Sequence, residues 1–79
     1  MYVYVVTLRY SVEDSDPLIR VAATPEIAHE VAKDWLFTYF SHDDDFVELA
    51  EKLDETYADD KERFWCGEIV DVSKVRVMR

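Results

Sequence analysis

Glycine, proline and cysteine are scarce in the 79-residue sequence, which contains one, two and one of them respectively. A phosphate-binding loop needs several glycines, so the sequence excludes a nucleotide site of that type. Linkers and low-complexity segments are rich in glycine, proline or serine, and this chain is unlike both. Because Cys66 has no second cysteine to pair with, no disulfide forms within the chain, and a reducing compartment is its natural location.

Long apolar runs are also absent. No stretch approaches the ~18 apolar residues that a transmembrane helix requires. The N-terminal segment MYVYVVTLRY has no basic residues before its apolar run and no small-residue cleavage site, so we expect no secretory signal. We therefore expect a cytoplasmic protein that has no membrane partner.

Basic residues are outnumbered, since nine lysines and arginines face eighteen aspartates and glutamates, for a net charge of −9. Residues 41–62 carry ten acidic and two basic side chains, whereas residues 1–40 sum to −3 and residues 63–79 to +2. Such a charge disfavours direct binding to nucleic acid and to anionic membranes, and it attracts basic surfaces. Solubility alone is the other explanation for the charge, and the sequence leaves both open.

Apolar residues make up 49% of the chain, and eleven residues are Phe, Trp or Tyr. A chain of this length forms one domain, residues 1–79, which buries about 60% of the surface that its unfolded state exposes. Aromatic side chains supply much of the core in such a small domain. Their regular spacing argues against intrinsic disorder.

Residues 2–10 alternate as in a β-strand, with an apolar side chain at every even position. The even positions should face the core, and the apolar odd positions Val3 and Val5 indicate a strand that is covered on both sides or lies in the centre of the sheet. The polar segment 11–16 (SVEDSD) predicts a turn. Residues 17–24 (PLIRVAAT) predict a second strand, paired with the first as a hairpin, with Ile19, Val21 and Ala23 facing inward.

Thr24 and Pro25 mark the start of a helix, because a threonine hydroxyl caps the first turn well and proline suits the first helical position. Six apolar residues at helical spacing predict its buried stripe. They are Ala28, Val31, Ala32, Trp35, Leu36 and Tyr39. The opposite, solvent-facing side should carry Glu26, His29, Glu30, Lys33, Asp34 and Phe37.

A break at residues 41–45 (SHDDD) precedes a second helix, which Ser41 or Asp43 can cap. Its predicted apolar stripe consists of Phe46, Leu49, Ala50, Leu53 and Tyr57. Residues 63–72 return to strand character, with Gly67 marking a bulge, and after a short break at residues 73–74 the chain ends in a last short strand or an extension of the previous one. The predicted fold is α+β, a two-layer sandwich of β-β-α-α-β order in which two helices cover one face of an antiparallel sheet of three or four strands.

Catalytic and metal-binding patterns are weak. Asp43, Asp44 and Asp45 are consecutive, whereas a calcium loop needs alternating ligands, a glycine and a closing glutamate. Cys66 and the two histidines have none of the spacings of a zinc site. We expect Cys66 to be a small packed residue of a strand, not a nucleophile. The sequence therefore predicts no enzyme activity, no metal and no cofactor.

The acidic side of the second helix is the predicted partner-binding site. Residues four apart on a helix lie ~6 Å apart along its axis, so Asp44, Glu48 and the following acidic residues form a row along about three turns. Like charges at this spacing repel by a few tenths of a kcal/mol per pair, which suggests that the charge has a use. The predicted contact residues are Asp43, Asp44, Asp45, Glu48, Glu51 and Glu55, with Phe37 as an exposed aromatic contact. An exposed aromatic residue without function is the alternative for Phe37.

The sequence resembles the small acidic proteins of phages and mobile elements, including anti-CRISPR proteins. The resemblance rests on size, charge and the order of an opening strand, a hairpin, a helix start, an acidic segment and a closing strand. The opening strand is YVYVVTLRY, the helix start is ATPEIAHEVAKDW, the acidic segment is SHDDDFVELAEKLDETYADD and the closing strand is WCGEIVDV. It implies inhibition of a host effector complex, such as a CRISPR complex, in the host cytoplasm if the protein is phage-encoded. No residue role carries over, because the resemblance includes no diagnostic motif.

Two functional hypotheses follow. In the first, the protein is a stoichiometric inhibitor whose carboxylates pair with arginines and lysines on a nucleic-acid-binding surface of its protein partner. In the second, it is a non-enzymatic accessory domain that self-associates as a homodimer through its sheet, which the two-sided apolar character of residues 2–6 favours. An enzyme with a small pocket on the sheet face is a third and weaker hypothesis.

Overall fold

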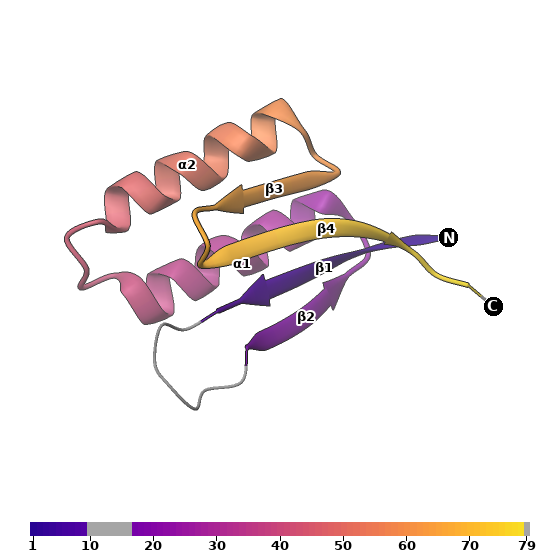
Figure 1. The fold of residues 1–79 in the computed structure, drawn as a ribbon, viewed down its shortest axis with the longest axis horizontal. Helices are drawn as coiled ribbons and strands as arrows, with labels where there is room; N and C mark the ends of the chain where they lie inside the picture. Colours follow the sequence, from indigo (N-terminus) through magenta and orange to yellow (C-terminus); the bar gives the residue numbers. More distant parts are fainter. Residues whose placement is uncertain (10–16, 79) are drawn as a thin grey trace.

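The computed structural model describes residues 1–9 and 17–78, which form a four-stranded sheet and two helices (Figure 1). The elements are β1 (Tyr2–Leu8), β2 (Leu18–Ala22), α1 (Pro25–Phe40), α2 (Phe46–Asp59), β3 (Arg63–Cys66) and β4 (Val70–Arg76). The strand order is β2-β1-β4-β3, and all neighbouring strands are antiparallel. The predicted α+β class and two-layer arrangement are confirmed, with a β-β-α-α-β-β order. The predicted turn at residues 11–16 lies outside the described residues.

The core lies between the helices and one face of the sheet. Val6 and Leu8 of β1 are fully buried, and they pair with Val72 and Val70 of β4, which are buried too. Phe64 of β3 continues this layer toward the edge of the sheet. The prediction that the even positions face the core is confirmed for Tyr4, Val6 and Leu8, whereas Tyr2 is 50% exposed and Tyr10 lies outside the described residues. Strand β1 is central in the sheet, which explains its apolar odd positions.

Strand β2 has the opposite orientation from the one predicted. Ile19 and Val21 are 63% and 58% exposed on the face that the helices leave open, whereas Ala22 is buried. The register pairs Tyr4 with Ala22 and Leu8 with Leu18, which turns the even residues of β2 inward. Because side chains alternate along a strand, a register shift of one residue exchanges the two faces completely.

Residues 63–76 form a hairpin, so the predicted continuous strand with a bulge at Gly67 and a break at residues 73–74 is wrong. Gly67 follows β3 and has a φ of 58°, a left-handed conformation that glycine adopts without steric cost. The amide of Ile69 donates to the carbonyl oxygen of Cys66 across this turn at 3.3 Å. Ser73 lies in the middle of β4, paired with Arg63.

Helix α1 begins as predicted. The amide of Ile27 donates to Oγ1 of Thr24 at 3.2 Å, and Pro25 is the first helical residue. The buried residues of α1 are Ala28, Ala32 and Leu36. His29 does not lie on the solvated side, as the sequence suggested, because its ring stacks on Tyr57 with centroids 4.2 Å apart.

Helix α2 begins at Phe46 without a side-chain cap, so the predicted cap from Ser41 or Asp43 is wrong. The chain instead closes a backbone turn, in which the amide of Phe46 donates to the carbonyl oxygen of Asp43 at 3.1 Å. Ser41 belongs to the C-terminal end of α1. The predicted apolar stripe of α2 does face the core, with Leu53 fully buried at its centre.

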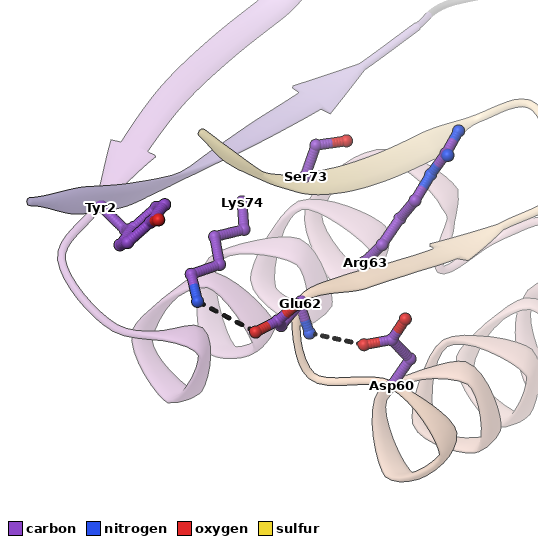
Figure 2. A pocket seen from close by; sticks show the side chains of 6 residues that line it. All are labelled: Tyr2, Asp60, Glu62, Arg63, Ser73 and Lys74. Atoms are coloured by element: carbon purple, nitrogen blue, oxygen red, sulfur yellow. Dashed lines mark hydrogen bonds and ion pairs between the residues drawn. The ribbon is translucent and has the colours of Figure 1, made fainter. Parts of the chain in front are cut away.

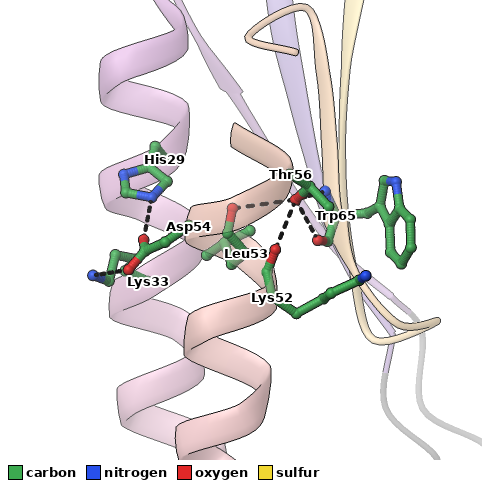
Figure 3. A network of polar contacts seen from close by, with 7 residues as sticks. All are labelled: His29, Lys33, Lys52, Leu53, Asp54, Thr56 and Trp65. Carbon is green, nitrogen blue, oxygen red and sulfur yellow. Dashed lines mark hydrogen bonds and ion pairs between the residues drawn. The ribbon is translucent and has the colours of Figure 1, made fainter. Parts of the chain in front are cut away.

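Helix α2 runs alongside β3 and covers the outer edge of this strand (Figures 1 and 3). Oγ1 of Thr56 accepts the amide of Trp65 at 3.0 Å and donates to the carbonyl oxygen of the same residue at 2.7 Å. One side chain thus satisfies both backbone groups that Trp65 directs away from the sheet. An edge strand is protected in this way against pairing with another chain.

Candidate functional site

The two layers of the molecule carry opposite charge. Residues 25–59, which comprise both helices and their connection and are called the helical layer below, contain eleven acidic and two basic side chains, a net charge of −9. The four strands together contain four basic side chains and one acidic side chain, a net charge of +3. The field of the protein is therefore strongly negative on the helical side, where it can orient a cationic partner during approach.

The six predicted carboxylates form the acidic helix surface, which consists of Asp43, Asp44, Asp45, Glu48, Glu51 and Glu55. All six are exposed. Glu48, Glu51 and Glu55 share one face of α2 because they are three and four residues apart. The buried Leu53 lies on the opposite side of this helix. The surface therefore points away from the core, as the sequence predicted.

Nearby cations do not neutralise the acidic helix surface. The ammonium group of Lys52 lies 5.0 Å from the ring centroid of Trp65, and that of Lys61 lies 5.0 Å from the ring centroid of Tyr57. In the described part of residues 41–62, ion pairs involve only Asp54 and Glu62, neither of which belongs to the surface. The six carboxylates are therefore available to an external cation.

A largely apolar hollow of about 390 Å³ lies between α1 and α2, and its lining includes none of the six carboxylates. Leu36, Phe37, Phe46 and Ala50 supply its apolar lining, and Glu30, Lys33 and Asp34 complete it. Phe37 is 65% exposed, and its ring meets that of Phe46 edge to face, with centroids 6.3 Å apart. We call this feature the Phe37 hollow. It places the predicted aromatic contact beside Glu30 and Asp34 of α1.

A polar network joins the two helices behind the acidic helix surface (Figure 3). Asp54 accepts from Nε2 of His29 at 2.8 Å and from Nζ of Lys33 at 3.3 Å. Partial burial alone would raise the pKa of Asp54, but the hydrogen bonds from His29 and Lys33 outweigh this effect and hold its pKa below the ordinary 3.8. This network fixes α2 against α1, and with it the orientation of the acidic row.

We expect the Asp54→Asn substitution to lower the free energy of unfolding by less than about 1 kcal/mol at neutral pH, because water screens this half-exposed pair. A lowered pKa in the folded state stabilises the fold above the ordinary pKa, and this contribution disappears as the pH falls through the lowered value. The difference between variant and wild type should therefore shrink from pH 7 to pH 3 in urea titrations. Glu51→Gln is the control, and a difference that grows toward acid would contradict the assignment.

Cys66 is fully buried in the core, as predicted, and desolvation raises the pKa of its thiol to about 11, although a hydrogen bond with the backbone of Val70 opposes this rise. The thiolate, which is the reactive form, is therefore rare at neutral pH. Within residues 1–9 and 17–78, no three His, Cys, Asp or Glu side chains are close enough to hold a metal ion.

A larger hollow of about 540 Å³ lies at the end of the sheet near Tyr2 (Figure 2). It contains one ion pair. Nζ of Lys74 donates to Oε1 of Glu62 at 2.9 Å and lies 4.3 Å from the ring centroid of Tyr2. The glutamate holds the pKa of Lys74 above its ordinary value. With two acidic and two basic side chains around it, this hollow favours no ligand of either charge.

Sequence reasoning missed two parts of the surface. Glu30 and Asp34 were expected to be solvated, but their position beside the Phe37 hollow was not foreseen. The inward orientation of Phe46 and Ala50 was predicted from their spacing. The hollow beside them was not, because a gap between two helices depends on how the helices cross.

None of the helices in the described chain is long and apolar enough to cross a membrane. Comparison with protein-family models, with curated proteins and with solved structures finds no match for this chain.

Proposed function

We propose that the protein is a stoichiometric protein-binding inhibitor that uses the acidic helix surface to occupy a basic, nucleic-acid-binding surface of another protein. The observation that carries this proposal is the set of six exposed carboxylates without an ion pair in the described chain, on a helical layer of net charge −9. Repulsion within such a set costs free energy in the isolated protein, and a cationic partner relieves it.

The spacing of the carboxylates suits a surface that normally holds phosphates. Glu48 and Glu55 are seven residues apart in α2, which corresponds to about 10 Å along the helix, and Asp44 lies in the turn before it. Phosphates recur every ~3.4 Å along one DNA strand, so the row offers fewer charges than a strand over the same length. Arginine and lysine side chains that bind phosphate also bind carboxylate through charge-assisted hydrogen bonds. The partner's basic groove is therefore a suitable receptor for this row.

The Phe37 hollow adds an apolar contact to the charged one. Binding energy at protein interfaces comes mainly from a few well-packed residues, often aromatic, surrounded by polar contacts that exclude water. An aliphatic or aromatic side chain of the partner can enter the hollow while its basic neighbours meet Glu30 and Asp34. This arrangement favours a protein partner over a small cation, because a small cation would not use the hollow.

The resemblance to anti-CRISPR proteins makes a CRISPR effector complex the first partner to test. A labelled target DNA is bound to the purified complex, and fluorescence anisotropy follows its release as the protein is added. We expect release at a stoichiometric ratio. The Glu48→Lys, Glu51→Lys, Glu55→Lys variant should fail to release the DNA while its circular dichroism stays that of the wild type, because reversed charges repel the basic groove. Inhibition that survives these three reversals would refute the role of the surface.

A matched pair of double variants separates the surface from the overall charge. Glu51→Lys with Glu55→Lys, and Glu26→Lys with Glu68→Lys, change the net charge equally, and all four residues are exposed. We expect the first pair to weaken binding at least about 100-fold, or about 2.7 kcal/mol, and the second pair to weaken it much less. Equal losses in both variants would mean that net charge alone attracts the partner.

A further inference from the structure

The sheet face opposite the helices is largely apolar, and no helix or strand of the described chain covers it. Along the register, three rows of side chains cross this open sheet face. They are Ile19–Thr7–Asp71–Trp65, Val21–Val5–Ser73–Arg63 and Val3–Val75. Ile19 and Val21 are more than half exposed, and Val75 and Trp65 are 42% and 40% exposed. The ring of Trp65 projects from the strand away from the helices in Figure 3. A connected apolar patch of this kind marks an interaction surface in soluble proteins.

The open sheet face carries little charge for a protein of net charge −9. At its edge the ammonium group of Lys52 lies 5.0 Å from the ring centroid of Trp65. Its strands contribute one basic residue, Arg63, and one acidic residue, Asp71, on neighbouring strands. Neither forms an ion pair with another described residue. A contact with twofold symmetry brings Arg63 of one copy toward Asp71 of the other and repeats the pair reciprocally. The face is therefore complementary to itself in charge as well as in polarity.

We propose that two copies of this chain associate through their open sheet faces, packing sheet against sheet into a four-layer homodimer. This proposal is independent of the inhibitor function, because it uses none of the residues of the acidic helix surface. The charge distribution favours a second copy as the occupant. A twofold contact through the helical side would instead bring a helical layer of net charge −9 toward its counterpart.

Face-to-face packing places the two helical layers on the outside of the dimer. Each copy is 16 Å thick along its shortest axis, which is the direction of view in Figure 1. Packed sheets lie about 10 Å apart, so the two outer surfaces would be about 40 Å from each other. This separation is several times the Debye length of about 8 Å at physiological ionic strength, so the two helical layers scarcely repel one another.

The size of the face sets the expected affinity. Four strands about 4.8 Å apart and about seven residues long give a face of roughly 20 by 20 Å. Burying such a face on both copies removes roughly 800 Å² from water, which is below the ~1,200 Å² of stable specific complexes and in the range of weak, transient ones. We therefore expect a reversible dimer with a Kd on the order of 10 µM, not an obligate one.

Sedimentation velocity over a concentration series tests the proposal with a matched set of Val→Lys substitutions. Val21→Lys and Val75→Lys place a lysine on the open sheet face, whereas Val47→Lys makes the same change on α2 at a similar exposure, 62% against 58% for Val21. All three variants are less negative than the wild type, so a greater net charge cannot explain a loss of association. We expect the wild type and Val47→Lys to dimerise and the other two variants to remain monomeric, with Kd raised at least about 30-fold.

Salt provides a second test that distinguishes the two proposals. Screening should change the dimer little, because its contact is mainly apolar and the helical layers scarcely repel one another, whereas it should weaken binding to a basic partner strongly. The proposal is overturned if the wild type stays monomeric at all concentrations. It is also overturned if Val75→Lys dimerises like the wild type, which would indicate pairing through the edge of β2. If Val21→Lys fails to fold, Val75→Lys on the other half of the face decides the outcome.

Discussion

The Phe64→Ala variant should lose about 3–5 kcal/mol of unfolding free energy, because Phe64 is the largest fully buried side chain of the protein's described part. Its ring meets that of Tyr57 edge to face at 5.0 Å and that of His29 at 6.0 Å. Truncation removes these contacts and leaves a cavity between α2 and the sheet. A domain of this length has a total stability of about 4–12 kcal/mol, so the variant keeps only part of it.

Urea unfolding followed by tryptophan fluorescence measures this loss. Phe37→Ala is the matched control, because the same atoms are removed from a side chain that is 65% exposed, and we expect it to cost less than about 1 kcal/mol. Phe64→Leu should retain enough stability for a complete transition if the alanine variant is unfolded throughout. Similar losses at positions 64 and 37 would show that the core is not centred where we place it.

The Thr56→Val variant should lose about 1–2 kcal/mol of unfolding free energy, because the edge strand β3 loses its hydrogen bonds to α2. Valine has nearly the same shape as threonine but lacks the hydroxyl, which bonds both backbone groups of Trp65. The same oxygen lies 3.0 Å from the carbonyl oxygen of Lys52 and 3.2 Å from that of Leu53, but its single proton is best placed toward Trp65 at 2.7 Å. The amide of Trp65 should exchange with solvent faster in this variant.

Hydrogen exchange and urea unfolding together check the role of Thr56. Thr38→Val makes the same change at an exposed position of α1 and should alter stability by less than about 0.5 kcal/mol. Thr56→Ser keeps the hydroxyl and should protect the amide of Trp65 almost as well as threonine does. If Trp65 stays protected in Thr56→Val, the packing of α2, and not the hydroxyl, covers the strand edge.

The features that depend on residues close together in the sequence were predicted correctly. The start of α1 depends on Thr24 and Pro25, which act within one turn, and the structure confirms both roles. The stripe of α2 around Leu53 is a strong periodic pattern that leaves little choice of inward face. The central position of β1 could also be inferred, because Val3 and Val5 are apolar on the side away from the core.

The features that depend on contacts with other parts of the chain were not predicted correctly. The segment 18–22 is apolar at both odd and even positions, so its inward face is decided by pairing with β1, which the sequence of β2 alone does not encode. Gly67 suits a bulge and a turn equally well. The adjoining Glu68 and Ile69 complete a turn that divides β3 from β4. The missing cap of α2 shows that a polar residue before a helix does not always bond its first turn.

The candidate surface was predictable in part. Exposure of Glu48, Glu51 and Glu55 follows from helical periodicity, because the opposite side of α2 is apolar. Their lack of ion pairs did not follow, since Lys52 could have turned toward Glu48 or Glu55, and it instead reaches the ring of Trp65. The separation of charge between helices and strands needed the sheet order, because Arg20, Lys74 and similar residues are far apart in the sequence.

The covered edge of β3 determines how far this fold can extend by strand addition. Among the described strands, β2 is the one whose outer side has no hydrogen-bonded neighbour, since β1 and β4 are central and Thr56 occupies the backbone groups of Trp65. Fibre growth requires every molecule to accept a neighbour at two edges. A molecule with only one open sheet edge can add one further strand, or pair with one other copy of itself, and the sheet cannot then grow further.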